Sequence, residues 1–294
     1  MKHEKSSLQL SHHFDWSAQT YVMGILNLTP DSFSGDGILA QANPIKHALG
    51  QAEAFLQAGA HILDIGGEST RPGAQTLSVE DELARVLPAI QAVTDQYPSA
   101  ILSIDTYKAD VATAALQAGA HIVNDVWALR ADARMASVVA EAGCPVVLMH
   151  NRSKPNELAV SQRLGGRYIG SEYDDLLGNI AAELLASVDL ARQAGIADSQ
   201  MILDIGIGFG KTVTQNLQLT RELSYFRKLG FPILYGPSRK SFIGYTLNLP
   251  VQERLEGTAA SVALAIANGA NIIRVHDVKE MVRVARMTDA ILRA

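Results

Sequence analysis

The sequence predicts an α/β protein folded as one closed (β/α)8 barrel, and three observations carry this prediction. The hexapeptide QAGAHI occurs at residues 57–62 and again at 117–122, and a relative, ANGANI, occupies residues 267–272. Each copy ends an alanine-rich, helix-like stretch and opens a short apolar run, the pattern of a helix, a glycine stop and a buried strand. The 294 residues also suit the roughly 250 that such a barrel uses, with some left for loops.

Eight short apolar segments, most of them rich in β-branched residues, are typical of parallel strands buried on both faces. We expect them at residues 22–28, 62–66, 101–105, 122–126, 145–150, 201–206, 232–236 and 272–276. Helix-like segments separate them: Ser78 and the acidic residues after it predict a capped helix start, and residues 172–194 read as a long helix that Gly195 ends. The stretch 151–171 could be an ordered element or a mobile flap.

The same alternation continues without a linker, which indicates a single barrel domain over residues 21–294. Residues 1–20 form a short N-terminal extension, of which residues 8–20 would plug the N-terminal mouth of the barrel.

The formal charge of −5 argues against a general nucleic-acid binder. The single cysteine, Cys144, excludes an internal disulfide and is expected to be buried. No apolar run or signal sequence indicates a membrane or export, so we expect a cytoplasmic protein.

Polar side chains follow the predicted strands at the end where the strands of a barrel share one mouth. Taken singly, each is explained as a cap or turn residue. Taken together, they are costly to bury without partners, which a polar ligand would supply. Carboxylates and amides suit a heterocycle with many N–H donors, and basic residues suit an anion. These residues are Asn27, Asp64, Asp105, Asn124, Asp125, His150, Asp204, Ser238, Lys240, Arg274 and His276.

Four loops at the same mouth add candidates. Residues 29–37 and 66–74 are polar and glycine-rich, which is typical of mobile lids or surface turns. Residues 206–212 lack the spacing of a phosphate-binding loop, so we interpret them as a turn with Phe209 as a wall. Lys211 is interpreted as solvated or structural rather than catalytic. Residues 237–242 lead into a helix whose first N–H groups, beside Ser241, would seat a carboxylate or phosphate.

Eight collinear blocks, from about residue 20 to the C-terminus, resemble the dihydropteroate synthase family. The two specific blocks are MGILNLTPDSFS at 23–34 and DIGGESTRPG at 64–73. The others are SIDT at 103–106, VND at 123–125, LMH at 148–150, DIGIGFGK at 204–211, SRKS at 238–241 and RVHD at 274–277. The resemblance implies a TIM barrel and a folate-pathway transferase. This enzyme would join 6-hydroxymethyl-7,8-dihydropterin diphosphate to p-aminobenzoate, giving 7,8-dihydropteroate and diphosphate.

The resemblance also implies roles for individual residues. The pterin would be held by Asp105, Asn124, Asp204 and Lys240, with Met149 and Phe209 along its faces. The diphosphate would be bound by Arg71, Arg274 and His276, and by a Mg²⁺ ion with Asn27 as its ligand. The p-aminobenzoate and lid-loop residues would be Asp31, Phe33, Ser34, Thr70, Arg71, Pro72 and Ser241. Catalysis is expected to depend on Asp105, Asp204, Lys240 and Arg274.

No obvious nucleophile is found among the strand ends, and the implied chemistry needs none. Loss of diphosphate would leave a pterin-methylene cation, as in an SN1 reaction. Asp105 and Asp204 would stabilise the positive charge through ring N–H groups, and Mg²⁺ and Arg274 the leaving group. Closed lids would keep water from the cation.

Two departures from the family pattern concern local geometry. Ile205 stands where family members usually carry proline, and Ala128-Leu129 where glycine is often found. A homodimer is expected from the resemblance, through helices after the sixth and seventh strands, including the alanine-rich run 259–267.

Three rival functions stay open at this point. One is a barrel that presents methyltetrahydrofolate for methyl transfer to a corrinoid protein, although that activity would not need the SFS or STRPG loops. A second is a pterin-binding protein without catalysis, for which Asn27, Arg274 and His276 would have no use. A third is a barrel that acts on another phosphorylated metabolite.

Overall fold

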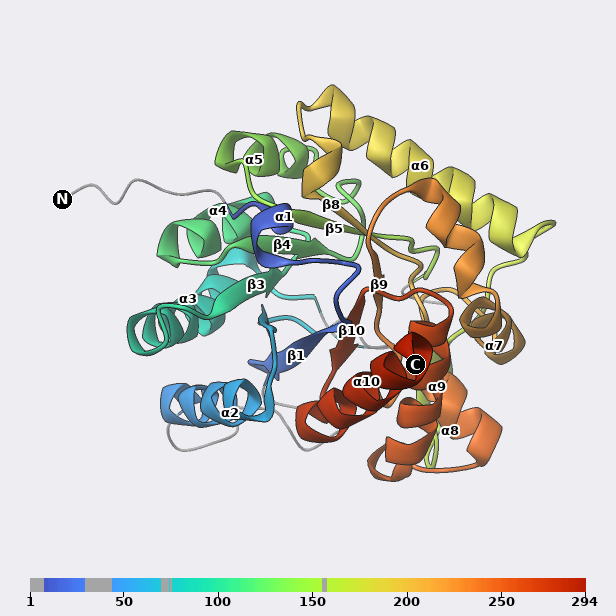
Figure 1. Ribbon diagram of the computed structural model, residues 1–294. Coiled ribbons are helices and arrows are strands. Elements are labelled where there is room, and N and C mark those ends of the chain that lie inside the picture. The colour runs from blue at the N-terminus through green and yellow to red at the C-terminus, as the bar shows by residue number, and fades with distance from the viewer. Residues whose placement is uncertain (1–7, 30–43, 70–73, 75, 155–157) are drawn as a thin grey trace.

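Eight parallel strands close into a barrel, in the order β1-β10-β9-β8-β5-β4-β3-β2 (Figure 1). The structure is a computed structural model, and it describes residues 8–29, 44–69, 74, 76–154 and 158–294. The strands are β1 Tyr21–Asn27, β2 Ile62–Gly66, β3 Ile101–Asp105, β4 Ile122–Asp125, β5 Val146–Met149, β8 Met201–Asp204, β9 Ile233–Tyr235 and β10 Ile272–Val275. The predicted (β/α)8 barrel is therefore confirmed.

Helices surround the barrel as its outer layer (Figure 1). They are α2 Pro44–Ala58, α3 Val79–Gln96, α4 Ala109–Ala118, α5 Met135–Ala142, α6 Leu176–Gln193, α7 Val213–Arg221, α8 Ser241–Leu247, α9 Leu255–Ala267 and α10 Val278–Arg293. Short 3₁₀ turns cover η2 Asp198–Gln200, η3 Leu223–Leu229 and η4 Val251–Glu253. None of the helices in the described ranges combines the length and apolar character needed to cross a bilayer.

The strand predictions are right in number and place, and they differ from the structure by one or two residues at several ends. Proline lacks the N–H that a ladder requires, so residues 145 and 232 precede their strands. The Ser78 cap is confirmed, since its hydroxyl accepts a hydrogen bond from Asp81 N at 3.0 Å. The helix expected at 172–194 begins only at residue 176, because the Asp175 side chain caps it by accepting from Gly178 N.

The repeated hexapeptide has a local structural reason. Its glycines, Gly59 and Gly119, have φ values of 98° and 119°, which favour glycine after a helix. The next polar residue then bonds the neighbouring strand: His61 Nδ1 accepts from Val22 N at 3.0 Å, and His121 Nδ1 accepts from Leu102 N at 3.1 Å. In the relative ANGANI, the Asn271 amide oxygen accepts from Ile233 N at 2.9 Å. Each copy thus joins its strand to a neighbour.

The N-terminal end of the barrel is filled with apolar side chains. The inward residues at the starts of the strands form one buried cluster with Leu8, Leu10 and Phe14. Leu10 begins the short helix α1 (Leu10–His13), which lies in front of the barrel in Figure 1. Thr20 also ties this segment to α10, because its N–H and hydroxyl donate to the Asp289 carboxylate at 2.8 and 2.9 Å.

The stretch 151–171, whose order the sequence left open, contains an antiparallel hairpin in its described part. The hairpin consists of β6 Leu158–Ser161 and β7 Gly165–Tyr168. Its strands pair only with each other and not with the barrel.

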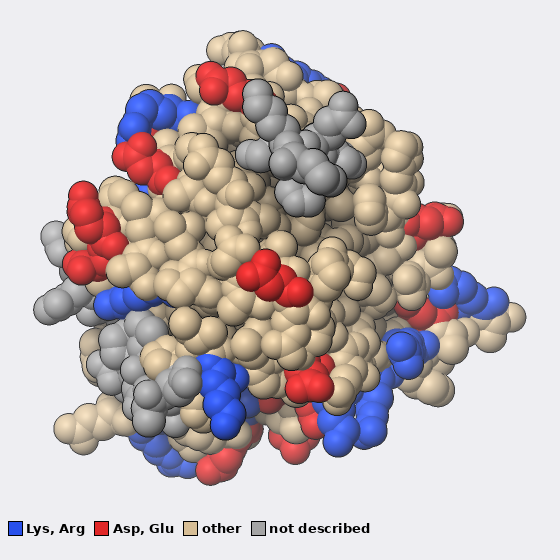
Figure 2. Space-filling view, turned by 90° about the vertical axis from the view of Figure 1, so that its left-hand side faces the viewer, with Lys and Arg blue, Asp and Glu red and all other residues tan. Residues whose placement is uncertain are grey.

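The face on the left of Figure 1 carries scattered acidic and basic side chains with neutral areas between them (Figure 2). Mixed surface charges of this kind agree with the small net charge of −5.

Candidate active site

A pocket opens at the carboxyl ends of the barrel strands, where their last inward side chains are polar or charged. Alternation along each strand selects these side chains, since residues two apart share a face. All ten described residues of the predicted site line this pocket. They are Asn27, Asp105, Asn124, Met149, Asp204, Phe209, Lys240, Ser241, Arg274 and His276. The other six, Asp31, Phe33, Ser34, Thr70, Arg71 and Pro72, lie outside the described residues.

Arg274 is the centre of a charged cluster at the floor of the pocket. Its Nε donates to Asp64 Oδ2 and its Nη2 to Asp105 Oδ2, both at 2.6 Å. Asp64 also accepts from Asn124 Nδ2 at 3.1 Å, while its Oδ1 has no partner among the described residues. Asp64 was predicted at a strand end without a role, and the structure shows that it holds two predicted site residues.

Burial affects the pKa values of two members of this cluster, Asp105 and Arg274. It raises the pKa of Asp105, against the opposing effect of Arg274. For Arg274 the balance is reversed: burial opposes the charge, but Asp64 and Asp105 raise its pKa overall. The guanidinium is therefore charged, and it favours the ionised form of Asp105 against the effect of burial.

Asp204 and Lys240 form a second charged group across the pocket. Asp204 Oδ1 accepts from Gly206 N at 2.7 Å, which orients the carboxylate. The Lys240 ammonium donates to the carbonyl of Ile207 and lies 4.4 Å from the centre of the Phe209 ring. Burial raises the pKa of Asp204 and lowers that of Lys240 to about 8. A ligand with ring N–H donors and a carbonyl acceptor would satisfy both.

His276 and Ser238 form a hydrogen-bonded polar pair that lines the same pocket as Arg274. The Ser238 hydroxyl accepts from His276 N at 3.1 Å and lies 2.9 Å from His276 Nδ1. Asn27 lines the same pocket and brings a neutral amide oxygen. The described residues hold no group of three His, Cys, Asp or Glu side chains that could bind a metal ion.

The donor set fits Mg²⁺ only in one way. This ion keeps several waters and is often bound through one or two protein oxygens together with substrate phosphates. A single oxygen from Asn27, in the same pocket as cationic Arg274, therefore suits magnesium that arrives with a diphosphate, rather than an ion caged by protein alone.

Two predicted strand-end residues, Asp125 and His150, do not face the pocket, and that expectation was wrong. Each follows an inward residue directly, so the alternation of the strand turns it outward. The Asp125 carboxylate instead accepts from Trp127 N at 2.8 Å and Leu129 N at 2.7 Å, the cap role considered for each residue alone.

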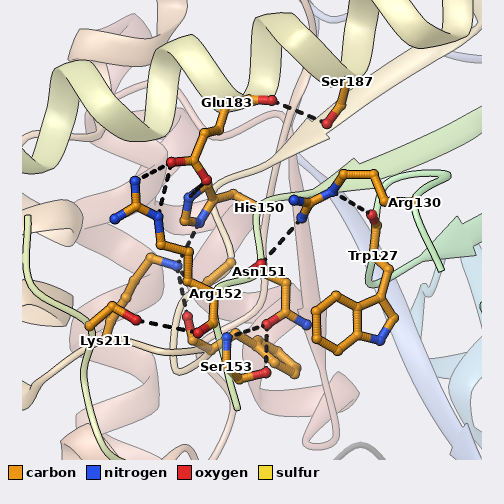
Figure 3. Close-up of polar contacts among 12 residues, drawn as sticks. Trp127, Arg130, His150, Asn151, Arg152, Ser153, Glu183, Ser187 and Lys211 are labelled. Carbon is orange, nitrogen blue, oxygen red and sulfur yellow. Dashed lines mark hydrogen bonds and ion pairs between the residues drawn. The ribbon is translucent and has the colours of Figure 1, made fainter.

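His150 is buried and belongs to a polar network outside the pocket, in which Glu183 and Arg152 are partly exposed (Figure 3). Its Nε2 lies 3.1 Å from Glu183, which also pairs with Arg152, and its Nδ1 lies 3.0 Å from Lys211 Nζ. Burial and the neighbouring Lys211 lower the pKa of His150 to about 4, so the imidazole is neutral.

Lys211 is structural and not solvated, since only 3% of it is exposed. Its ammonium donates to the carbonyls of Gly206 at 2.8 Å and Phe209 at 3.0 Å, which fixes the glycine-rich turn. Burial lowers the pKa of Lys211 to about 7.

One departure from the family pattern has a visible consequence. Ala128 and Leu129 have φ values of 52° and 66°, in the left-handed region that favours glycine. Both side chains are buried, and the Asp125 cap holds the turn. Ile205, which replaces the usual proline, is a fully buried core residue.

The sequence did not predict one wall of the pocket. Leu164, Gly165, Gly166 and Tyr168, all from the β6–β7 hairpin, line it together with Arg254. A glycine pair before an alternating segment was the signal for a hairpin, but nothing in the sequence placed that hairpin at the mouth.

Comparisons with known proteins agree with this geometry. Residues 23–276 match the family described as pterin binding enzyme. The dihydropteroate synthase of a Synechocystis strain is 48% identical over 281 residues, which are 95% of this chain and 93% of that protein.

Solved structures show the same similarity. The Clostridium difficile dihydropteroate synthase, determined in the presence of pteroic acid, has a TM-score of 0.86 at 43% identity and covers 96% of this chain and 100% of its own. That of Xanthomonas albilineans with 4-aminobenzoic acid has a TM-score of 0.84 at 37% identity, covering 95% of both. Because this similarity extends over nearly the whole length, the chain belongs to the dihydropteroate synthases, a family of pterin-binding enzymes.

Proposed function

We propose that this protein condenses 6-hydroxymethyl-7,8-dihydropterin diphosphate with 4-aminobenzoate to form 7,8-dihydropteroate and diphosphate. The observation that carries the proposal is that one pocket holds the carboxylates Asp105 and Asp204 beside the cations Lys240 and Arg274. The ligands of the two similar solved structures, pteroic acid and 4-aminobenzoic acid, support the same substrates.

The pterin ring would lie over the charged floor. Its N–H and amino groups would donate to Asp105, Asn124 and Asp204, and its carbonyl would accept from Lys240. Met149 and Phe209 would contact the ring faces. Hydrogen bonds from the ring favour the ionised form of both aspartates, whose pKa burial raises in the protein alone.

The reaction would begin when the bond between the methylene carbon and the diphosphate oxygen breaks. The electron pair leaves with the diphosphate, and the positive charge spreads into the pterin ring, where Asp105 and Asp204 stabilise it. Arg274 and His276, with Arg71 from its loop, would bind the leaving group.

The amine nitrogen of 4-aminobenzoate would then attack the methylene carbon and form the C–N bond. Its extra proton passes to solvent or to the departing diphosphate. Ser241, at the start of α8, would hold the carboxylate, which keeps the amine directed toward the pterin. The loop residues Asp31, Phe33, Ser34, Thr70 and Pro72 complete this half of the proposed site by resemblance.

Magnesium is proposed to accompany the diphosphate, with Asn27 as its protein ligand. When bound, the ion would neutralise charge on the leaving group. The remaining work of binding and orienting the diphosphate falls to Arg274 and His276.

The test is to mix the protein with the pterin diphosphate, 4-aminobenzoate and Mg²⁺, and to measure dihydropteroate and diphosphate together. We expect equal amounts of both, with loss of both when magnesium is omitted or in Asp105→Ala. Pterin binding without either product would contradict the proposal and favour methyl transfer or simple binding.

A homodimer is proposed as the assembled form. Leu217 of α7, Leu247 of α8 and Leu264 of α9 are large apolar side chains exposed on helices that follow the sixth and seventh barrel strands. Light scattering at micromolar concentration should give twice the mass of one chain, and a mass of 31.5 kDa would refute the dimer.

A further inference from the structure

We infer that the β6–β7 hairpin is a specificity wall for the amine substrate, an inference that rests on the proposed function. The hairpin restricts which substituents the ring of that substrate can carry.

The inner strip of the hairpin faces the half of the pocket that contains Ser241. Leu164, Gly165 and Gly166 line the cavity there, together with Val251 from η4. A Cβ built on Gly165 would meet only Val251, at 3.9 Å, so the backbone at this point borders open space. Leu164 therefore supplies the large apolar side chain of this strip.

Arg254 fixes the hairpin to the opposite rim of the pocket. Only 2% of this residue is exposed, and its Nη2 donates to the carbonyls of Leu164 at 2.9 Å and Leu249 at 3.1 Å. Its Nη1 donates to the carbonyl of Arg239 at 3.0 Å, in the segment that leads to Ser241. The Arg254 guanidinium thus links the hairpin to the segment before Ser241, the proposed binding position of the carboxylate. Both acceptors are main-chain carbonyls, so the link fixes the backbone of the two segments relative to each other.

Helix α8 provides a second attachment on the same side. Arg163 Nη2 donates to the Asn248 carbonyl at 3.0 Å, and the Tyr245 hydroxyl donates to the Gly165 carbonyl at 3.5 Å. The guanidinium of Arg167 lies 5.2 Å from the centre of the Tyr245 ring. Ser241 is the first residue of this helix, so the hairpin and Ser241 share one support.

The other edge of the hairpin is tied to the pterin side. The Tyr168 ring stacks on Phe209, with centroids 6.2 Å apart and planes inclined by 28°. Just beyond the hairpin, Ser171 N donates to the Gly210 carbonyl at 3.0 Å. With attachments on both sides, the hairpin has a fixed distance from Ser241, and Leu164 sets the width available beside the amine substrate's carboxylate.

The experiment compares 4-aminobenzoate with 4-amino-2-methylbenzoate, which carries a methyl group next to the carboxylate. We expect Leu164→Ala to raise the ratio of kcat/KM for the methylated to the unmethylated amine about tenfold, the lower end of the effect of one methylene in an apolar pocket. Leu164→Phe should lower the same ratio. The KM for the pterin diphosphate should stay within about twofold of the wild-type value in both variants, because Leu164 lies in the Ser241 half of the pocket.

Val160→Ala is the matched control, since Val160 belongs to the same hairpin but is 78% exposed. It should change neither the ratio nor the KM. Opposite effects of Ala and Phe at one position cannot come from a merely loosened hairpin. An unchanged ratio in an enzyme that makes dihydropteroate would overturn the specificity wall alone, and so would an equal loss for both amines. Absence of product from the wild-type chain would overturn the proposed function, and this inference with it.

Discussion

The two ends of the barrel are built from the same strands but have inward side chains of different character. On a single strand, two residues separate an apolar inward side chain at one end from a charged one at the other. In β8, Ile202 belongs to the apolar cluster at the N-terminal end, whereas Asp204 lines the pocket. In β10 the same step leads from Ile272 to Arg274. One end is closed by an apolar cluster, and the other keeps buried charges near an open pocket.

This difference teaches that stability and chemistry are separated along the strand direction. The closed end contributes burial of apolar area, which needs no particular partner. The open end depends on specific pairs, because a buried charge without a partner is costly. Substitutions at equivalent inward positions should therefore affect different properties of the protein.

The largest effect is expected at the open end. Asp204→Asn keeps the shape and an oxygen that can accept from Gly206 N, but removes the charge that would stabilise the pterin cation. We expect kcat/KM to fall about 10²- to 10³-fold, with little change in the free energy of unfolding. Steady-state kinetics and urea denaturation measure the two quantities. Retained activity would mean that Asp204 has no electrostatic role.

The second test is a substitution at the closed end of the same strand, to be compared with Asp204→Asn. Ile202→Ala removes a fully buried side chain two residues before Asp204. The free energy of unfolding should fall by about 2–5 kcal/mol, because a cavity remains in the cluster. The kcat/KM of the folded fraction should stay within about twofold. A large catalytic loss with unchanged stability would disprove the separation of the two ends.

A smaller effect concerns pH at the open end. The pKa of Lys240 is lowered to about 8, so the side chain is protonated below this pH and neutral above it. We expect kcat/KM to decline above pH 8. If one proton is required, kcat/KM near pH 9 should be about tenfold lower than its value well below pH 8. Lys240→Arg should move this decline to higher pH, since a guanidinium stays charged. A decline that does not move would assign it to another group.

The smallest effect concerns Cys144, which precedes β5 on the closed side of the barrel. Burial raises the pKa of its thiol to about 12. The thiolate is the reactive form, so a disulfide reagent should label the native protein only as fast as it unfolds. Rapid labelling in buffer, compared with labelling in urea, would show that this end opens readily.

Much of the fold followed from local patterns. Short apolar runs and helix stops placed all eight barrel strands, because buried parallel strands and glycine-ended helices have strong sequence signals. Ten of the described residues that line the pocket were also predicted. Those at strand ends follow from the convergence of strand ends in any such barrel, whereas Phe209 and Ser241 came from loops at the same mouth and Met149 from the family resemblance.

The direction of Asp125 and His150 follows from strand alternation, because each comes directly after an inward residue, and the prediction did not apply that alternation to them. The remainder depended on contacts that no local pattern contains. The role of Arg254 depends on carbonyls far apart in the sequence, such as that of Leu164. The position of the hairpin likewise results from its contacts with α8 and Phe209.

The double ion pair of Arg274 has a consequence for how the two halves of a substrate act on one another. In the protein alone, the guanidinium is shared between Asp64 and Asp105. Under the proposed function, a pterin competes for Asp105 while a diphosphate competes for Arg274, so either fragment alone breaks at least one contact of this double ion pair without replacing it. A molecule carrying both groups replaces each lost contact at once. The free energies of binding of the separate fragments should then sum to less than that of the joined substrate, a form of cooperativity contained within a single site.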